Sequence, residues 1–138
     1  MEDSEPLAVP ERQTVSSGTA WEAKYGYTRA VRVGRHVHVS GTTATDSRGE
    51  IVGEGDAHEQ AQHIFTIITE ALQKLGSSLT DVVRTRTYVV DILANGDKVG
   101  KAHGEVFKDI RPAATMVEVS GLIAPGLLVE IEVDATLP

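Results

Sequence analysis

The amino-acid sequence predicts a single α+β domain in which two helices cover one face of a mixed sheet of roughly six strands. Three observations lead to this fold class. The chain has 138 residues, which is enough to bury one hydrophobic core. Apolar residues recur at steps of three and four between Ala57 and Leu75, a spacing typical of an amphipathic helix. Segments rich in valine, threonine and tyrosine precede and follow this helix, as expected for strands.

The predicted strands are bounded by turn-forming residues and by a polar N-terminal segment. Residues 1–12 carry acids and prolines without periodicity, so we expect a flexible tail followed by one domain over 13–138. Gly34 and Arg35 separate two valine-rich segments and predict a hairpin. Residues 41–55 are rich in glycine, threonine and aspartate and predict a loop. In chain order, the strands are predicted at 11–17, 28–33, 36–40, 51–52, 82–90, 113–120 and 127–135.

Local signals support both helices. Asp56 is placed to cap a helix over 57–75, with Glu59 three residues later, and Gly76 follows its last turn. A second helix is predicted over 97–107 from the spacing of its apolar residues. Two glycines inside it each lower the helix propensity by about 1 kcal/mol relative to alanine, unless they allow close packing.

Alternation along the predicted strands separates an apolar face from a charged face. The apolar side, which we expect the helices to cover, carries Val31, Val33, Val37, Val39, Val83, Val89, Val117, Val119, Val129, Ile131 and Val133. The opposite side carries Arg32, His36, His38, Arg84, Arg86, Tyr88, Met116, Glu118, Leu128, Glu130, Glu132 and Asp134. That side is either solvated or packed against other subunits, with Arg84 and Arg86 meeting Glu130 and Glu132 within or between chains.

Composition excludes several classes of function. The net charge is −7 and no cluster of lysine and arginine interrupts it, which argues against nucleic-acid binding. The absence of cysteine excludes disulfides, cysteine–zinc sites and thiol catalysis. No apolar run is long enough to cross a membrane, and the first residues do not resemble a signal peptide. We therefore expect a cytoplasmic protein with neither a membrane nor a nucleic acid as partner.

Few residue patterns suggest chemistry by themselves. His36 and His38 share one side of a strand, but no third metal ligand accompanies them, so we expect no metal site. Ser40 lacks the G-x-S-x-G context of a hydrolase nucleophile. Glu130 and Glu132 form a carboxylate pair that suits either proton transfer or ion pairing on the sheet.

Several segments taken together resemble one known family. They are Tyr25-Gly-Tyr-Thr-Arg-Ala-Val31, Val39-Ser-Gly41, the helix ending at Gly76, the stretch from Thr85 to Asp91, and the close of the chain from Pro112-Ala to Val129-Glu-Ile-Glu132. From about residue 14 to residue 135, the chain resembles the YjgF/RidA family. The resemblance implies a chorismate-mutase-like fold and a homotrimer with ligand clefts between neighbouring subunits. The best-studied members hydrolyse reactive imines and enamines, and this chemistry needs no cofactor.

The resemblance also implies site residues. Tyr27 matches a tyrosine that lines the cleft, and Ser40 and Gly41 match a Ser-Gly pair beside it. Met116 matches a position whose backbone contacts the ligand, and Glu130 matches the glutamate thought to orient the attacking water.

This chain departs from the family pattern at three places. Ala114 stands where the deaminases carry an arginine that grips the substrate carboxylate with two hydrogen bonds. Gly100 stands roughly where an asparagine is common, and the segment before Pro112 is shorter. Arg111 precedes Ala114 by three residues and is a candidate replacement for the missing cation, or a surface arginine before a proline.

Two functions follow from the sequence. The first is a RidA-like trimer that binds a small carbonyl, imine or carboxylate metabolite and adds water to a C=N bond, with weak activity on 2-iminopropanoate because of Ala114. The alternative is a non-catalytic, ligand-binding or chaperone-like trimer.

Overall fold

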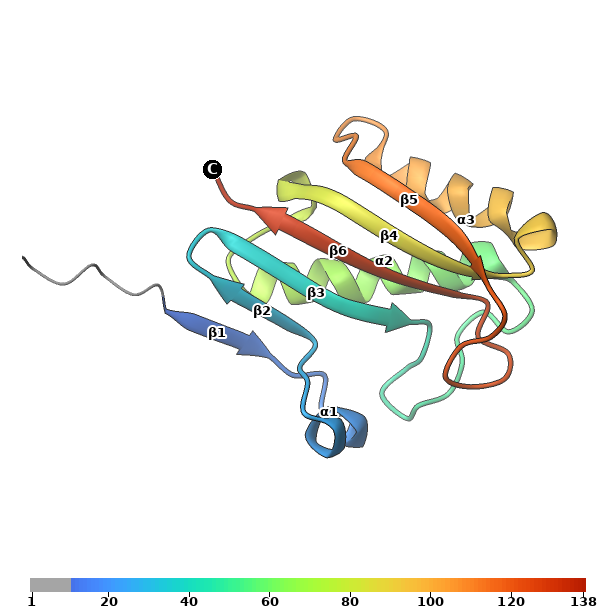
Figure 1. Cartoon of the computed structure of the whole chain (residues 1–138), viewed down its shortest axis with the longest axis horizontal. Helices are drawn as coiled ribbons and strands as arrows, with labels where there is room; N and C mark the ends of the chain where they lie inside the picture. Colours follow the sequence, from blue (N-terminus) through green and yellow to red (C-terminus); the bar gives the residue numbers. More distant parts are fainter. Residues whose placement is uncertain (1–10) are drawn as a thin grey trace, which may run out of the picture.

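Two helices lie against one face of a six-stranded sheet in the computed structural model, which describes residues 11–138 (Figure 1). The strands are β1 (Arg12–Val15), β2 (Ala30–Val33), β3 (His36–Thr43), β4 (Val82–Val90), β5 (Ala113–Val119) and β6 (Val129–Thr136). The helices are α1 (Ala20–Tyr25), α2 (Ala57–Lys74) and α3 (Ile92–Phe107), with a 3-10 turn, η1, at Leu79–Asp81. The predicted α+β class and the two covering helices are confirmed. The tail predicted over 1–12 falls mainly on residues 1–10, which lie outside the described residues.

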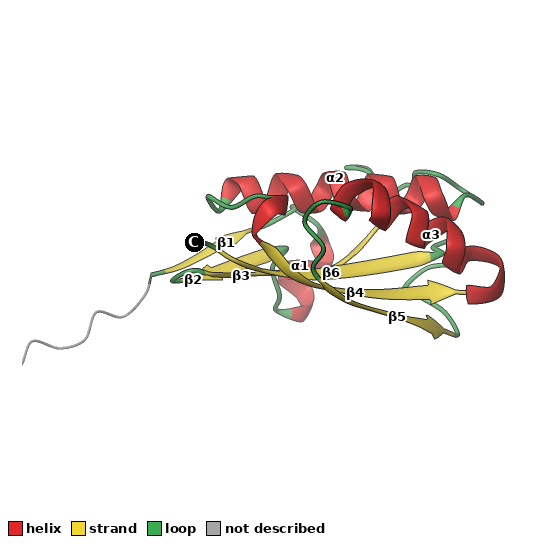
Figure 2. Cartoon of the chain, turned by 90° about the horizontal axis from the view of Figure 1, so that it is seen from above, coloured by secondary structure: helices red, strands yellow, loops and turns green. Residues whose placement is uncertain are grey.

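The sheet is mixed, with strand order β1-β2-β3-β6-β4-β5. Only β4 and β5 pair in parallel, and α3 connects them; the other neighbours are antiparallel. The two C-terminal strands follow each other in sequence but are not neighbours, because β4 lies between them (Figure 1). Figure 2 shows α2 and α3 together on one side of the sheet, which leaves the other side without a covering layer among residues 11–138.

The core lies between α2, α3 and the central strands. Ile64, Ile68 and Leu72 of α2 are fully buried, and so are Val99 and Ala102 of α3. Burying each large aliphatic side chain contributes about 1.5–3 kcal/mol, which explains why α3 forms despite its glycines. None of the helices among the described residues is long and apolar enough to cross a membrane.

The start of α2 follows the predicted capping pattern. Asp56 accepts a hydrogen bond from the Glu59 backbone N–H at 3.1 Å. After the helix, Gly76 adopts a positive φ of 79°, which a glycine tolerates without strain.

The predicted side of the sheet is wrong for β2. The two-residue turn pairs Val33 with His36 and Val31 with His38, so both valines lie on the uncovered face. Arg32 lies instead on the helix side, where its Nη1 donates to the Leu75 carbonyl at 2.7 Å. Arg32 thereby donates to a carbonyl that has no partner within the helix at the end of α2. The charge of Arg32 therefore wrongly suggested a position on the uncovered face.

The predicted side is also wrong for β5 and for one residue of β4. Met116 pairs with Thr87 and faces α3, whereas Val117 lies on the uncovered face and is 43% exposed. Glu118 was predicted on the uncovered face but lies on the helix side, and Val119 was predicted on the helix side but lies on the uncovered face. The reason is that β5 is an edge strand whose valines are not covered by a helix. Val83 lies at an irregularity in the β4–β6 pairing and is 49% exposed.

Two helix predictions also need correction. Residues 20–25 form α1, although no helix was predicted there. The second covering helix, α3, begins at Ile92 and not at residue 97, because one side chain from β5 and one from its own first turn satisfy polar groups at its start. Glu118 accepts a hydrogen bond from the Ile92 N–H at 3.1 Å, and Asn95 donates to the Val90 carbonyl at 2.8 Å. The signal for this start therefore comes partly from another strand.

Candidate functional site

The strongest candidate site lies on the uncovered face of the sheet, where β3 bends against β6. Their pairing shifts between Val39 and Thr42, so that Ser40 and Gly41 form a bulge. A Cβ built at Gly41 would lie 3.0 Å from Cδ and 3.3 Å from Cγ of Glu130. The absence of a side chain at Gly41 therefore allows the Glu130 carboxylate to lie directly against the bulge.

The Glu130 carboxyl is partly buried beside charged groups. Burial raises its pKa, the nearby Arg29 guanidinium partly offsets the increase, and Glu132 adds to it. Arg29 Nη1 donates to Thr42 Oγ1 at 3.4 Å, and its Nε is buried without a hydrogen-bond partner among the described residues. A carboxyl with a raised pKa exchanges its proton nearer to neutral pH, which suits general acid–base chemistry.

Arg29 interacts electrostatically with three of the polar side chains in this region. Burial lowers the pKa of Arg29, and the charges of Glu22, Tyr27 and Glu130 counteract this decrease. These three side chains therefore act on one guanidinium, although they come from α1, the loop after it and β6.

Glu22 holds the segment before this site in place. It is 5% exposed, and its carboxylate accepts hydrogen bonds from Ser16 Oγ at 2.8 Å, from Ser17 N at 3.1 Å and from the Ser17 hydroxyl. Burial alone would raise the pKa of Glu22, but the hydrogen bonds, first from Ser17 and then from Ser16, outweigh it and leave the pKa below its usual range. The Tyr27 N–H donates to the Glu22 carbonyl at 3.1 Å, so α1 also positions Tyr27.

Tyr27 and Ser40 complete this group. The Tyr27 side chain is 43% exposed and available for contact. Ser40 Oγ donates to the Thr28 carbonyl at 2.6 Å, so this hydroxyl has a structural partner and is not poised as a nucleophile. The structure thus brings four of the predicted site residues together at one end of the sheet: Tyr27, Ser40, Gly41 and Glu130.

Ala114 and Met116 lie elsewhere. Both residues are on the side of β5 that faces α3, whereas Glu130 is on the uncovered face. They line a cavity of about 290 Å³ between α3 and strands β4 and β5. The residues around this cavity are Thr85, Thr87, Gly100, His103, Ala114, Thr115 and Met116.

Arg111 lies in the turn between α3 and β5, and β5 is the edge strand opposite to β1 and β2, which α1 connects. It is exposed, has a positive φ of 58°, and its side chain makes no hydrogen bond or ion pair within residues 11–138. A single chain therefore does not bring Arg111 to Tyr27 or Glu130. Its role as a ligand cation stays a prediction.

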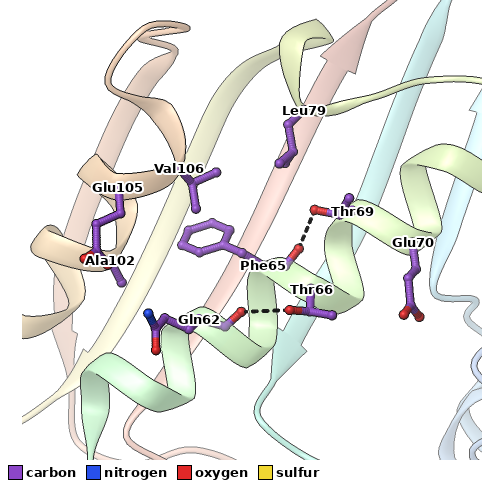
Figure 3. A pocket seen from close by; sticks show the side chains of 9 residues that line it. All are labelled: Gln62, Phe65, Thr66, Thr69, Glu70, Leu79, Ala102, Glu105 and Val106. Atoms are coloured by element: carbon purple, nitrogen blue, oxygen red, sulfur yellow. Dashed lines mark hydrogen bonds between the residues drawn. The ribbon is translucent and has the colours of Figure 1, made fainter.

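A second hollow lies on the outer side of the helix layer, between α2 and α3 (Figure 3). Phe65, Leu79 and Val106 supply its apolar surface. Its threonine hydroxyls are already used within α2, since Thr66 donates to the Gln62 carbonyl at 3.2 Å and Thr69 to the Phe65 carbonyl at 2.7 Å (Figure 3). This hollow contains no catalytic arrangement.

The histidines have separate structural partners. His38 Nδ1 lies 2.7 Å from Asp134 Oδ1, and His58 Nε2 lies 2.7 Å from Glu105 Oε1. Among the described residues, no group of three or more histidine, aspartate or glutamate side chains is arranged to hold a metal ion.

Sequence reasoning did not assign a site role to Arg29 or His103. Arg29 directly precedes β2, and its carbonyl accepts a hydrogen bond from the Ser40 N–H at 2.9 Å. Its place next to Tyr27, within the segment that resembles the family, was the available signal. For His103 the decisive contact, with Thr85 of β4, comes from another segment, so no local pattern identified it.

Comparisons with known proteins agree with this architecture. A family model described as endoribonuclease L-PSP matches residues 17–137. The chain belongs to this family, which is also named YjgF or RidA. An uncharacterized protein of Streptomyces coelicolor is 40% identical over 122 residues, covering 88% of this chain and 89% of that protein. A RutC family protein of Pyrococcus abyssi is 36% identical over 110 residues, covering 79% of this chain and 84% of that protein.

Solved structures of YjgF proteins show the same fold. A crystal structure of a Mycobacterium tuberculosis member of the YjgF/YER057c/UK114 family has 46% sequence identity and a TM-score of 0.83, and the match covers 92% of this chain and 100% of the other. A yeast protein with 22% identity still superposes with a TM-score of 0.80, over 93% of this chain and 100% of the other, which shows the shared fold alone.

Proposed function

We propose that this YjgF family protein assembles into a homotrimer and binds a small carbonyl, imine or carboxylate metabolite in clefts between its subunits. The uncovered face of the sheet supports the assembly. It carries valines at positions 31, 33 and 117 beside charged side chains that already pair within the chain. Arg86 lies 2.9 Å from Asp134 and 3.7 Å from Glu132, and Tyr88 donates to Glu132 at 3.0 Å. A face with both apolar residues and neutralised charges is suited to packing against another subunit.

The division of the candidate residues supports a site built from two subunits. Tyr27, Ser40, Gly41 and Glu130 lie at one end of the uncovered face, and Ala114, Met116 and Arg111 belong to the opposite edge of the sheet. Within the trimer, the edge strand of one subunit lies beside the Glu130 end of the next. The cleft is complete only when both groups contribute.

The proposed reaction is hydrolysis of an imine or enamine. Glu130 accepts a proton from a water molecule, whose oxygen attacks the C=N carbon, and passes this proton to the nitrogen. The C–N bond of the resulting amino alcohol then breaks, the nitrogen takes the proton of the new hydroxyl group and leaves as ammonia, and a carbonyl compound remains. The backbone amides of Gly41 and Met116 hold the oxyanion that develops on the substrate. This chemistry needs no cofactor.

The observation that carries the proposal is the position of Glu130. Its carboxyl lies against Gly41 and near Arg29, on a face without a covering layer, and burial raises its pKa. A carboxylate with only a structural role on a sheet face gains stability from full solvation or close ion pairing. Glu130 forms no ion pair within 4 Å among the described residues, so catalysis or ligand binding explains a carboxylate at this position better.

The test combines assembly with turnover. Light scattering should give the mass of three 14.8 kDa chains, and reversing the charges of Arg84, Arg86 and Glu130 together should weaken the assembly. Ammonia release should be measured from amino-acid-derived imines generated in situ, with Glu130→Gln as the variant. A monomer at micromolar concentration would remove the basis for the cleft.

A non-catalytic, ligand-binding trimer is the second candidate, because Ala114 provides no guanidinium for a substrate carboxylate. Ammonia release that is equal in the wild type, in Glu130→Gln and without protein would favour this candidate. A ribonuclease function is disfavoured, because the net charge of −7 opposes RNA binding.

A further inference from the structure

The cavity between α3, β4 and β5 has properties that set it apart from a site for an anion. Its volume of about 290 Å³ suits a small metabolite or one end of a larger one. Two small residues keep it open, since Ala114 and Gly100 face it from β5 and α3. A Cβ built at Gly100 would meet nothing within 4 Å, so the space above this glycine is free.

Within residues 11–138, His103 is the only titratable group that lines the cavity. Its Nε2 lies 2.8 Å from Thr85 Oγ1, and its ring packs 4.8 Å from the Phe107 ring and 6.1 Å from the Phe65 ring. Burial lowers the pKa of His103, so the ring is neutral at physiological pH. The cavity wall therefore carries no formal charge.

Hydrogen-bonding groups at this wall are available to a ligand. Nε2 of His103 is used by Thr85, while Nδ1 makes no hydrogen bond within residues 11–138. Thr87 is 3% exposed, and its hydroxyl also makes no side-chain hydrogen bond within the same residues. A ligand that excludes water from these two atoms must supply their hydrogen bonds, because a buried donor or acceptor without a partner is unfavourable. Met116 supplies an apolar surface beside them.

We propose that this cavity binds the neutral polar end of a small ligand, a hydroxyl, carbonyl or carboxamide group, which is hydrogen-bonded by His103 and Thr87. The inference rests on the proposed function, since Ala114 and Met116 belong to the proposed cleft, and it names the class of ligand that this part of the cleft selects. A carboxylate is disfavoured here because it would lose its hydration without meeting a cation. A carboxylate held by Arg111 would lie outside the cavity, because Arg111 does not line it.

Two probes of matched shape test the inference. The neutral probe is 2-oxopropanamide, and the charged probe is 2-oxopropanoate. Each is titrated into the full chain at pH 7.5 while the imidazole proton resonances of His103 are followed by NMR, assigned with the His103→Phe variant. We expect a saturable shift with the amide and a dissociation constant at least about tenfold higher for the carboxylate, which corresponds to about 1.4 kcal/mol.

Two glycines on α3 provide a matched pair of variants. Gly100→Leu should fill the cavity and weaken binding of the amide at least about tenfold. Gly104→Leu should leave that binding unchanged, because Gly104 has the same open surroundings but does not line the cavity. Both changes replace a helix glycine and favour the helix, so loss of folding does not explain a difference between them. His103→Phe keeps the packing against Phe107 and should also reduce amide binding.

The outcomes separate this inference from the proposed function. Saturable binding of the amide that Gly100→Leu abolishes supports the inference even if no imine is hydrolysed. Absence of a His103 shift, tighter binding of the carboxylate at His103, or equal binding by the Gly100→Leu variant overturns it. Each of these results leaves the assembly and ammonia-release tests of the proposed function intact.

Discussion

Gly41→Ala tests whether the structure positions Glu130 through the absence of one side chain. The added methyl group would lie 3.0 Å from Cδ of Glu130 and 3.3 Å from its Cγ, and closer still to Oε2. Gly41 is not among the glycines with positive φ, so alanine fits the backbone conformation. The carboxylate of Glu130 must therefore rotate away, because it is the flexible end of a side chain.

The effect on stability should be small, and the effect on the site large. Turning one side chain away from its preferred rotamer costs about 0.5–1.5 kcal/mol. Replacing glycine by alanine restores about 0.4–1 kcal/mol by restricting the unfolded chain. The free energy of unfolding should therefore change by less than about 1 kcal/mol. Displacing a catalytic group by about 1 Å lowers turnover on the order of 100-fold.

Three measurements check this expectation. Urea unfolding gives the stability, NMR titration of the Glu130 side-chain carbon gives its pKa, and ammonia release gives the activity. The pKa of Glu130 should fall toward the ordinary range of a glutamate once its carboxyl reaches solvent.

Gly104→Ala is the control for the substitution itself, since a Cβ there meets nothing within 4 Å, and it should stabilise the protein by about 1 kcal/mol. In a Glu130→Gln background, Gly41→Ala should cause no further loss of activity. A loss of stability above about 3 kcal/mol would mean that backbone, and not a side chain, blocks the methyl group. An unchanged pKa with full activity would refute the proposed position of Glu130.

Three further changes have expected outcomes. Glu22→Gln should destabilise the protein by about 1–3 kcal/mol at pH 7, because it weakens charged hydrogen bonds to a buried carboxylate. The pKa of Glu22 is lowered in the fold, so its contribution is complete above the ordinary glutamate pKa of about 4.3 and is lost as pH falls through the lowered value; unfolding curves of the two proteins should converge in acid. Wild-type turnover of 2-iminopropanoate should be about 30- to 1000-fold below that of relatives with an arginine at position 114, and Ala114→Arg should raise it, as kcat/KM measurements would show. Arg111→Gly should stabilise the fold by about 1 kcal/mol because it relieves the positive φ of 58°, whereas Arg111→Ala should not. If Arg111 holds a ligand carboxylate, Arg111→Ala should weaken calorimetrically measured binding of carboxylate ligands by about 1–3 kcal/mol and leave binding of their amides unchanged.

Local patterns predicted the elements whose stability depends on their own residues. The helix beginning at Ala57 was predicted from its apolar spacing and from Asp56, and the structure reproduces both its extent and its cap. The hairpin at Gly34 was predicted from its turn residues, and β2 and β3 pair across it. In contrast, Arg32 was placed on the wrong face, since its position depends on a carbonyl of a helix that lies 43 residues later in the chain.

The sequence by itself determined the fold class and, through its resemblance to the YjgF family, the residues to examine. Helix periodicity and turn chemistry are local properties, so they can be recognised before any contact is known. Only the tertiary structure decided the electrostatic setting of Glu130, because the bulge at Gly41 and the guanidinium of Arg29 reach it from other strands. It also decided the neutral character of the cavity beside Ala114, since burial between α3 and the sheet lowers the pKa of His103.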